Sequence, residues 1–132
     1  MNCILDTHSL LWTLFSPEKL SVSARKEIVN RENDISVSVV TFWEISLKYA
    51  LGKLELVGVN PEDLPEAAEQ VGLDILPLKK EDAASFYRLP RLAHKDPFDR
   101  LIIWQAIRNK MALVSADTSF KVYAKHGLTI HW

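Results

Sequence analysis

The sequence is poor in several features that would mark other classes of protein. Its single cysteine, Cys3, excludes both a disulfide framework and a cysteine-based zinc site, and suits a reducing compartment. Its apolar runs are short, and the run Leu10 to Phe15 is far too short to cross a bilayer. No basic segment followed by an apolar stretch and a cleavage site is recognisable. We therefore expect a cytoplasmic protein that does not enter the membrane.

An excess of charge of either sign is also lacking. The chain carries 16 Lys and Arg against 17 Asp and Glu, for a formal net charge of -1. This argues against a strongly basic nucleic-acid coat but not against RNA as a substrate, because local basic groups can hold phosphates. With 48% hydrophobic and 25% charged residues in 132, the composition is that of an ordinary globular protein with one core. We predict one domain over residues 1–132.

Short apolar runs alternate with segments of helical periodicity along the chain. This alternation predicts an α/β fold with a mostly parallel central sheet of four or five strands and helices on both faces. In the helix predicted over 80–89, Ala83, Ala84, Phe86 and Tyr87 are expected to face inward. A loop is predicted over 90–95. The predicted strands are 2–5, 35–39, 74–78, 113–115 and 128–132, and the predicted helices are 8–15, 22–33, 41–51, 61–71, 80–89, 118–125 and one that begins at 97.

Four acidic side chains, Asp6, Glu44, Asp99 and Asp117, follow four separate apolar runs or lie at the start of the helix after them. In open sheets of this kind, ligands bind beyond the carboxyl ends of the strands. We therefore expect the four acids to converge on one edge. Two carboxylates roughly 5 Å apart repel by about 3 kcal/mol at an effective dielectric near 20, so such a cluster needs a cation.

Carboxylate oxygens suit Mg²⁺ or Mn²⁺, whereas zinc would require histidine or cysteine ligands. A divalent ion in such a site can lower the pKa of a bound water and neutralise charge on a phosphate. The four acids therefore predict hydrolysis of a phosphodiester. Among them, Asp6 is the hardest to explain otherwise, because an acid that closes a short apolar strand is costly to bury without a partner.

Other acids have structural explanations as well. Glu44 stands three residues after Thr41, so it fits a capping box as well as it fits a metal ligand. Asp96 precedes Pro97, which favours a role as helix N-cap. Asp99 would favour the helix dipole wherever it pointed. For Asp117, which is followed by Thr118 and Ser119, a turn or cap remains open.

Four stretches of the chain together form a more specific pattern. They are Ile4-Leu5-Asp6-Thr7-His8-Ser9-Leu10-Leu11-Trp12, Trp43-Glu44 with Lys48 and Gly52-Lys53-Leu54, His94-Lys95-Asp96-Pro97-Phe98-Asp99-Arg100-Leu101-Ile102, and Leu113-Val114-Ser115-Ala116-Asp117. This pattern resembles the PIN-domain family, and most closely its VapC-type toxins, the ribonuclease halves of toxin–antitoxin pairs. The resemblance covers nearly the whole chain and implies a PIN-like fold and an endoribonuclease that depends on Mg²⁺ or Mn²⁺.

The resemblance also assigns roles to residues and partners. It matches Asp6, Glu44, Asp99 and Asp117 to the metal-binding and catalytic acids of the family, and Ser115 to a hydroxyl, often threonine, that orients the site. Thr7 would either bond the cluster or simply begin a helix, and the role of Asp96 stays open. Arg100 would touch a phosphate, pair with a neighbouring acid or lie on the surface as a solvated or ion-paired arginine. The implied partners are an RNA substrate, a cognate antitoxin protein and a second copy of the chain in a homodimer.

Three side chains in the loop before Asp99 are basic, namely Arg91, His94 and Lys95. They would steady an RNA backbone or simply be solvated. The aromatic side chains of two early helices, Trp12, Phe15, Phe42 and Trp43, are expected mostly in the core, with one or two exposed as antitoxin anchors.

A non-catalytic PIN-like module that holds RNA or a partner is the main alternative, although it would have no need for a repulsive acid cluster. A phosphatase of the haloacid dehalogenase type fits poorly, since it wants a second aspartate where this chain has His8. A receiver domain wants an aspartate after the third strand, which here ends at Leu78.

Overall fold

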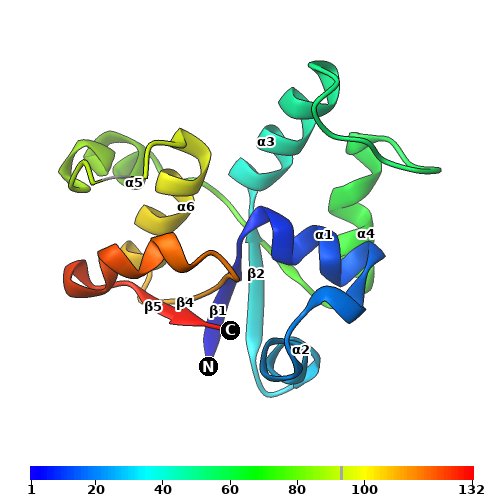
Figure 1. Cartoon of the computed structure of the whole chain (residues 1–132), viewed down its shortest axis with the longest axis horizontal. Coiled ribbons are helices and arrows are strands. Elements are labelled where there is room, and N and C mark those ends of the chain that lie inside the picture. The colour runs from blue at the N-terminus through cyan, green and yellow to red at the C-terminus, as the bar shows by residue number, and fades with distance from the viewer. Residues whose placement is uncertain (93) are drawn as a thin grey trace.

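In the computed structural model, the described residues, 1–92 and 94–132, contain five strands that pair in parallel in one sheet (Figure 1). The order across the sheet is β3-β2-β1-β4-β5. The predicted fold class is therefore confirmed. The strands are β1 (Asn2–Leu5), β2 (Asp34–Ser38), β3 (Asp74–Leu76), β4 (Ala112–Val114) and β5 (Thr129–His131).

The central strand β1 supplies side chains to both faces of the sheet, because successive residues of a strand point to opposite sides. Cys3 and Leu5 belong to one buried apolar cluster, and Ile4 belongs to another. The registers fix these neighbours, with Cys3 opposite Ile35 of β2 and Ile4 opposite Leu113 of β4. Two apolar layers thus hold the sheet between its helices.

The helices divide between the two layers. Side chains from α1, α2 and α4 pack in the cluster with Cys3, and side chains from α6 and η4 pack in the cluster with Ile4. The α-helices are α1 (Thr7–Phe15), α2 (Val22–Val29), α3 (Val39–Ala50), α4 (Leu64–Gln70), α5 (Lys80–Ser85) and α6 (Pro97–Arg108), and the 3-10 helices are η1 (Pro17–Lys19), η2 (Pro61–Asp63), η3 (Phe86–Arg88) and η4 (Thr118–His126).

Two expectations about helices are wrong. Helix α3 begins at Val39 rather than at Thr41, because the Ser38 side chain accepts a hydrogen bond from the Val40 amide and caps the helix directly after β2. The segment 80–89 is split into α5 and η3, and its inward face differs. Ala83, Ala84 and Tyr87 are exposed, whereas Asp82 is buried. The side chain of Asp82 is bonded by Arg108, which makes a polar residue tolerable at the inner face.

The strands and most helices lie within a few residues of the predicted ranges, with α2 ending at Val29. Residue 93, within the loop predicted over 90–95, lies outside the described residues. None of the helices described is long and apolar enough for a membrane span. The connections from β1 to α1 and from β2 to α3 are short, so both helices begin at the carboxyl edge of the sheet.

Candidate active site

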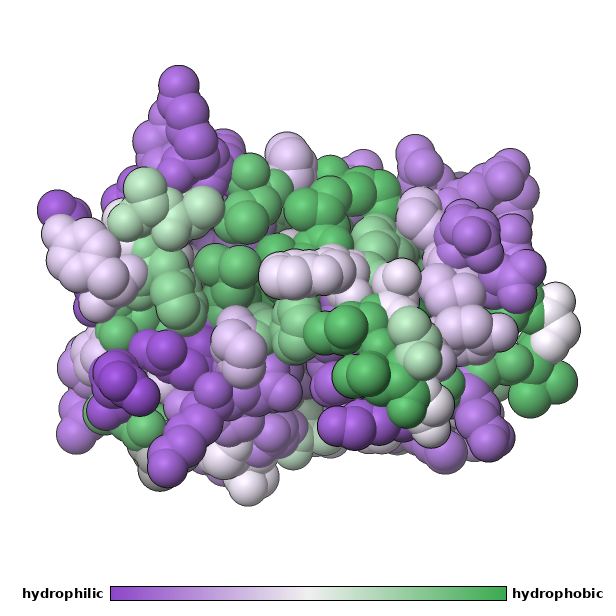
Figure 2. Space-filling view, turned by 90° about the horizontal axis from the view of Figure 1, so that it is seen from above, coloured by the Kyte–Doolittle hydropathy of each residue, from purple (hydrophilic) through white to green (hydrophobic). Residues whose placement is uncertain are grey.

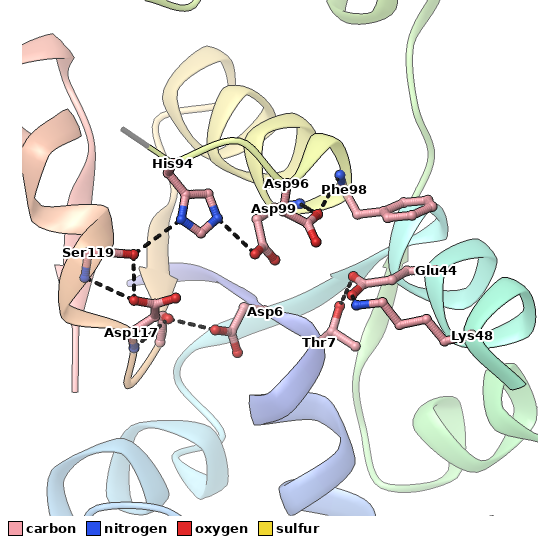
Figure 3. A network of polar contacts seen from close by, with 11 residues as sticks. Asp6, Thr7, Glu44, Lys48, His94, Asp96, Phe98, Asp99, Asp117 and Ser119 are labelled. Carbon is pink, nitrogen blue, oxygen red and sulfur yellow. Dashed lines mark hydrogen bonds and ion pairs between the residues drawn. The ribbon is translucent and has the colours of Figure 1, made fainter. Parts of the chain in front are cut away.

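The four acids singled out from the sequence lie around a common space at the carboxyl edge of the sheet (Figure 3). Asp6 joins β1 to α1, and Asp117 follows β4. Glu44 extends from α3, and Asp99 from the first turn of α6. As they stand, no three His, Cys, Asp or Glu side chains of the described residues are close enough together to hold a metal ion. Each carboxylate is instead held by hydrogen-bond donors of the chain.

Asp6 is only 6% exposed and caps helix α1. One carboxylate oxygen accepts a hydrogen bond from the Ser9 amide at 2.8 Å, and the other accepts one from the Ser115 hydroxyl at 2.6 Å. Burial raises the pKa of Asp6, and the bonds from Ser115 and Ser9 offset only part of that effect. The Ser115 hydroxyl therefore lies where it can orient this acid.

Glu44 is 3% exposed and is held by two donors. The Thr7 hydroxyl donates to one carboxylate oxygen at 2.6 Å, and the Lys48 ammonium pairs with the other at 2.5 Å. Thr7 thus both begins α1 and bonds an acid of the cluster. Because α3 begins before Thr41, Glu44 is not the returning half of a capping box. Burial works to lower the pKa of Lys48, but the bond and charge of Glu44 outweigh it and raise that pKa.

The carboxyl group of Asp99 also has a raised pKa. Burial is the first cause, the nearby charges of Asp96 and Glu44 add to it, and together they raise the pKa of Asp99 from 3.8 to about 6 despite a bond from His94. Nε2 of His94 lies 2.9 Å from the Asp99 carboxylate. Asp96 itself caps α6, accepting from the Phe98 and Asp99 amides at 2.9 and 3.0 Å, so the capping hypothesis for Asp96 is confirmed.

Asp117 caps η4 and is the most open of the four acids. Burial would raise the pKa of Asp117, but hydrogen bonds from the Ser119 hydroxyl and amide outweigh it, and the pKa lies below its usual range. The Ser119 hydroxyl is also 3.2 Å from Nδ1 of His94. If that hydroxyl donates to Asp117, its contact with Nδ1 requires the imidazole to donate from that nitrogen. His94 therefore links two acids of the cluster.

Among the ion pairs of residues 1–92 and 94–132, none joins Arg100 to a neighbouring acid. Its guanidinium donates to the main-chain carbonyls of Leu89 at 3.1 Å and Pro90 at 3.4 Å. The same group lies 4.9 Å from the ring centre of Phe86, in a cation–π arrangement. Arg100 is therefore a partly buried, fixed cation near the start of α6, not a loosely solvated surface arginine.

Three contact residues were not assigned to the site from the sequence. Lys48 follows Glu44 by four residues on one helix, a spacing from which the ion pair could have been inferred. Ser119 follows Asp117 by two residues, a common turn pattern. His94 was singled out only as a basic residue of the loop before Asp99, and its contact with Ser119, 25 residues away, had no signal in the sequence.

Not all of the early aromatic residues lie in the core. Trp43 is 61% exposed and Phe15 is 46% exposed, whereas Trp12 and Phe42 are half-buried. The Trp43 ring meets Phe98 edge-on, with 5.0 Å between ring centres. Figure 3 shows Phe98, the partner of Trp43, close to the acids, with its ring directed toward α3.

The donor set suits a hard divalent cation. All four acids offer oxygen atoms, and burial raises the pKa of Asp6 and Asp99, so their negative charges are not balanced in the protein alone.

The model of the PIN-domain family matches residues 3–126. This chain belongs to the PIN-domain family. Ribonuclease VapC22 of Mycobacterium tuberculosis is 26% identical over 114 residues, which are 86% of this chain and 85% of that relative.

Solved structures share the fold of this PIN-domain chain. VapBC2 from Rickettsia felis, bound to a DNA fragment from its promoter, includes a chain with a TM-score of 0.68 and 17% identity, over 99% of this chain and 98% of that one. FitAcB from Neisseria gonorrhoeae includes one with a TM-score of 0.63 and 22% identity, over 98% and 96%. These likenesses establish the fold.

Proposed function

We propose that this PIN-domain protein is an endoribonuclease that depends on Mg²⁺ or Mn²⁺ and acts as the toxin of a toxin–antitoxin pair. The observation that carries the proposal is the gathering of Asp6, Glu44, Asp99 and Asp117 at one edge of the sheet, two of them with raised pKa values. The likeness to a relative named a ribonuclease, over most of both chains, supports the same chemistry.

The four acids are the residues that would hold the ion. When bound, Mg²⁺ or Mn²⁺ supplies a water of lowered pKa and neutralises charge on a phosphodiester. Residues around the acids act as positioning groups. Ser115 and the Ser9 amide fix Asp6, and Thr7 fixes one oxygen of Glu44. Such bonds hold carboxylates in one orientation, as outer-shell partners do at other metal sites.

Lys48 adds positive charge close to the acids, and the ring of His94 adds a hydrogen-bond contact. His94 bonds Asp99, and Lys48 pairs with Glu44. The charge of Lys48 limits the repulsion among the carboxylates, since an opposite charge within a few ångströms favours the ionised form. The chain therefore contains its own groups that keep a dense acidic site compatible with folding.

The proposed protein partner is an antitoxin that covers the acidic edge. Figure 2 looks down on the molecule from the side of this edge, and hydrophobic residues form a broad band across the middle of the face. Trp43, exposed beside Glu44, is the side chain we propose as an anchor for an apolar segment of that partner. A short reading frame next to this one, encoding a DNA-binding protein with an amphipathic tail, is the genetic observation that we expect.

The test is cleavage of RNA by the purified protein with Mg²⁺ or Mn²⁺, with and without a chelator. We expect cleavage that needs the metal and disappears in a matched Glu44→Gln preparation, which also controls for contaminating nucleases. Full activity in chelator or in Glu44→Gln would contradict the proposal. A protein that binds RNA but never cuts it would instead be the non-catalytic module.

A further inference from the structure

We propose that a cavity beside the acids binds one backbone phosphate of the RNA, next to the phosphodiester that is cut. The cavity, here called the basic pocket, has a volume of about 280 Å³ and is lined by Arg91, Leu92, His94, Lys95 and Arg100. This inference rests on the proposed function, because it assigns a subsite for the same substrate. Its ligand class is a phosphodiester of single-stranded RNA.

The basic pocket combines a fixed cation with two free ones. Arg100 is held by the carbonyls of Leu89 and Pro90, so its charge stays at the wall of the pocket. Arg91 and Lys95 are exposed. In the described part of the chain, ion pairs involve Lys48, His94 and Arg108, and therefore leave the charges of Arg91 and Lys95 unneutralised. Such a set is suited to an anion with several oxygen acceptors.

His94 joins the basic pocket to the acidic edge. Its ring lines the pocket, and its Nε2 lies 2.9 Å from the Asp99 carboxylate. A phosphate in the pocket is thus separated from Asp99 by the width of one imidazole ring. Because an RNA chain carries a phosphate at every nucleotide, a chain held there presents a nearby phosphodiester to the carboxylates.

Electrostatics gives the reason for a phosphate site at this position. Four carboxylates repel a polyanion, and one divalent ion balances only part of their charge. Lys48 is already paired with Glu44, so it offers little further attraction. The basic pocket lies on the other side of the cluster and supplies the attraction that is needed. Backbone contacts of this kind position a nucleic acid without reading its sequence.

The experiment compares two double variants with the same change in charge. Arg91→Gln with Lys95→Gln removes the free cations of the pocket. Lys26→Gln with Arg31→Gln removes two exposed cations on α2 and the turn after it, at the opposite end of the sheet. Both are made in an Asp6→Asn background, where asparagine preserves the helix cap and the RNA stays intact. Binding of a fluorescent single-stranded RNA is then measured with Mg²⁺ over a range of salt concentrations.

We expect the pocket variant to bind RNA about tenfold more weakly at about 0.15 M salt, with the slope of log affinity against log salt smaller by about 0.7, the change for one phosphate contact on a single strand. The Lys26 and Arg31 variant should bind within about twofold of the background. Equal effects of the two variants, or no effect of either, would overturn the inference. Displacement of the RNA by inorganic phosphate at a concentration similar to that of the RNA would also overturn the inference, because the site would then be one for a free anion.

Two further readouts keep the inference separate from the proposed function. With Asp6 intact, the pocket variant should raise KM for RNA and leave kcat nearly unchanged, whereas a damaged fold would lower kcat. If the parent cuts no RNA but the pocket variant still weakens RNA binding, the function fails and the phosphate site stands. If the variant binds RNA normally and loses binding to a polyglutamate peptide, the pocket serves an acidic protein segment and the inference is wrong.

Discussion

A carboxylate lies at each end of helix α6, and the surroundings of these two carboxylates differ. At its C-terminal end, Asp82 is buried against Arg108 at 3.1 Å and Asn109 at 3.5 Å. At its N-terminal end, Asp99 is partly buried near other acids, with His94 as its partner and a pKa raised to about 6. Asp82, paired with the permanent cation Arg108, joins α5 to α6. Among the described residues, Asp99 has no permanent cation as partner, so its buried charge lowers the free energy of unfolding, and a bound metal ion can restore what is lost.

The largest expected effect is the stabilisation of the protein by metal, which should depend on the acidic site near the N-terminal end of α6 and not on Asp82 near its C-terminal end. Mn²⁺ at about 100 times its dissociation constant should raise the free energy of unfolding by about 2.7 kcal/mol, because the ion binds the folded chain only. Asp82→Asn should keep this increase, and Asp6→Asn should lose it. Denaturant unfolding with and without Mn²⁺ measures both. A parent protein that gains nothing from Mn²⁺ would remove the distinction between the two ends.

Replacement of Asp82, the acid that joins α5 to α6, should have the next largest effect on stability. Asp82→Asn should lower the free energy of unfolding by about 1–2 kcal/mol, since it breaks a buried contact between α5 and α6. The effect stays at this level because the Arg108 side chain is 41% exposed and can return to water. Urea denaturation measures it. The nearby exposed Glu81 provides the matched control, and Glu81→Gln should change stability little; an equal loss there would contradict the assignment.

Removing the charge of Asp99, at the N-terminal end of α6, should raise the free energy of unfolding instead of lowering it. The Asp99 pKa is raised from 3.8 to about 6 in the fold, so between these values the unfolded chain binds fewer protons and stability falls as pH rises. The penalty is complete above the folded value and absent below the unfolded one.

Asp99→Asn should therefore stabilise the metal-free protein by about 1 kcal/mol at about pH 7.5 and not at about pH 3.5. The side chain is 22% exposed, and solvent screening keeps the gain to this size. Thermal unfolding of both proteins across the pH range tests it. A destabilised variant at neutral pH would show that the contact with His94 outweighs the buried charge.

The smallest change concerns Lys48. Lys48→Met should reduce stability by less than about 0.5 kcal/mol, because the pair with Glu44 spans one helical turn and is partly open to water. Titration calorimetry should show tighter Mn²⁺ binding in this variant, since a competing positive charge is gone. Lys53→Met, an exposed lysine with no acid partner among the described ion pairs, is the control. Weaker Mn²⁺ binding in Lys48→Met would mean that Lys48 is needed to shape the site.

Much of the architecture could be predicted because it depends on local patterns. The short apolar runs 2–5 and 113–115 predicted β1 (Asn2–Leu5) and β4 (Ala112–Val114), and the start of α6 is encoded by Asp96 and Pro97. The inner face of 80–89 could not be predicted this way. There a buried Asp82 replaces apolar residues, and the partner that permits it, Arg108, lies 26 residues away.

The candidate site divides along the same line. That Asp6 and Asp117 follow apolar runs, and that Asp99 lies at the start of a helix, is visible in the sequence, and the parallel topology then places the ends of β1 and β4 at one edge. The start of α3 decided whether Glu44 would be a capping residue or part of the cluster, and this depended on whether Ser38 or Thr41 capped the helix. A shift of two residues rotates a helical side chain by more than half a turn.

By itself, the sequence determined the order of strands and helices and the acids that follow them, because periodicity and capping act over a few residues. Only the tertiary structure decided which donor meets each carboxylate. Thr7 reaches Glu44 across 37 residues, and Ser115 reaches Asp6 across 109. Such contacts form because parallel strands distant in sequence become neighbours in the sheet, and burial between them then sets the pKa values of the acids.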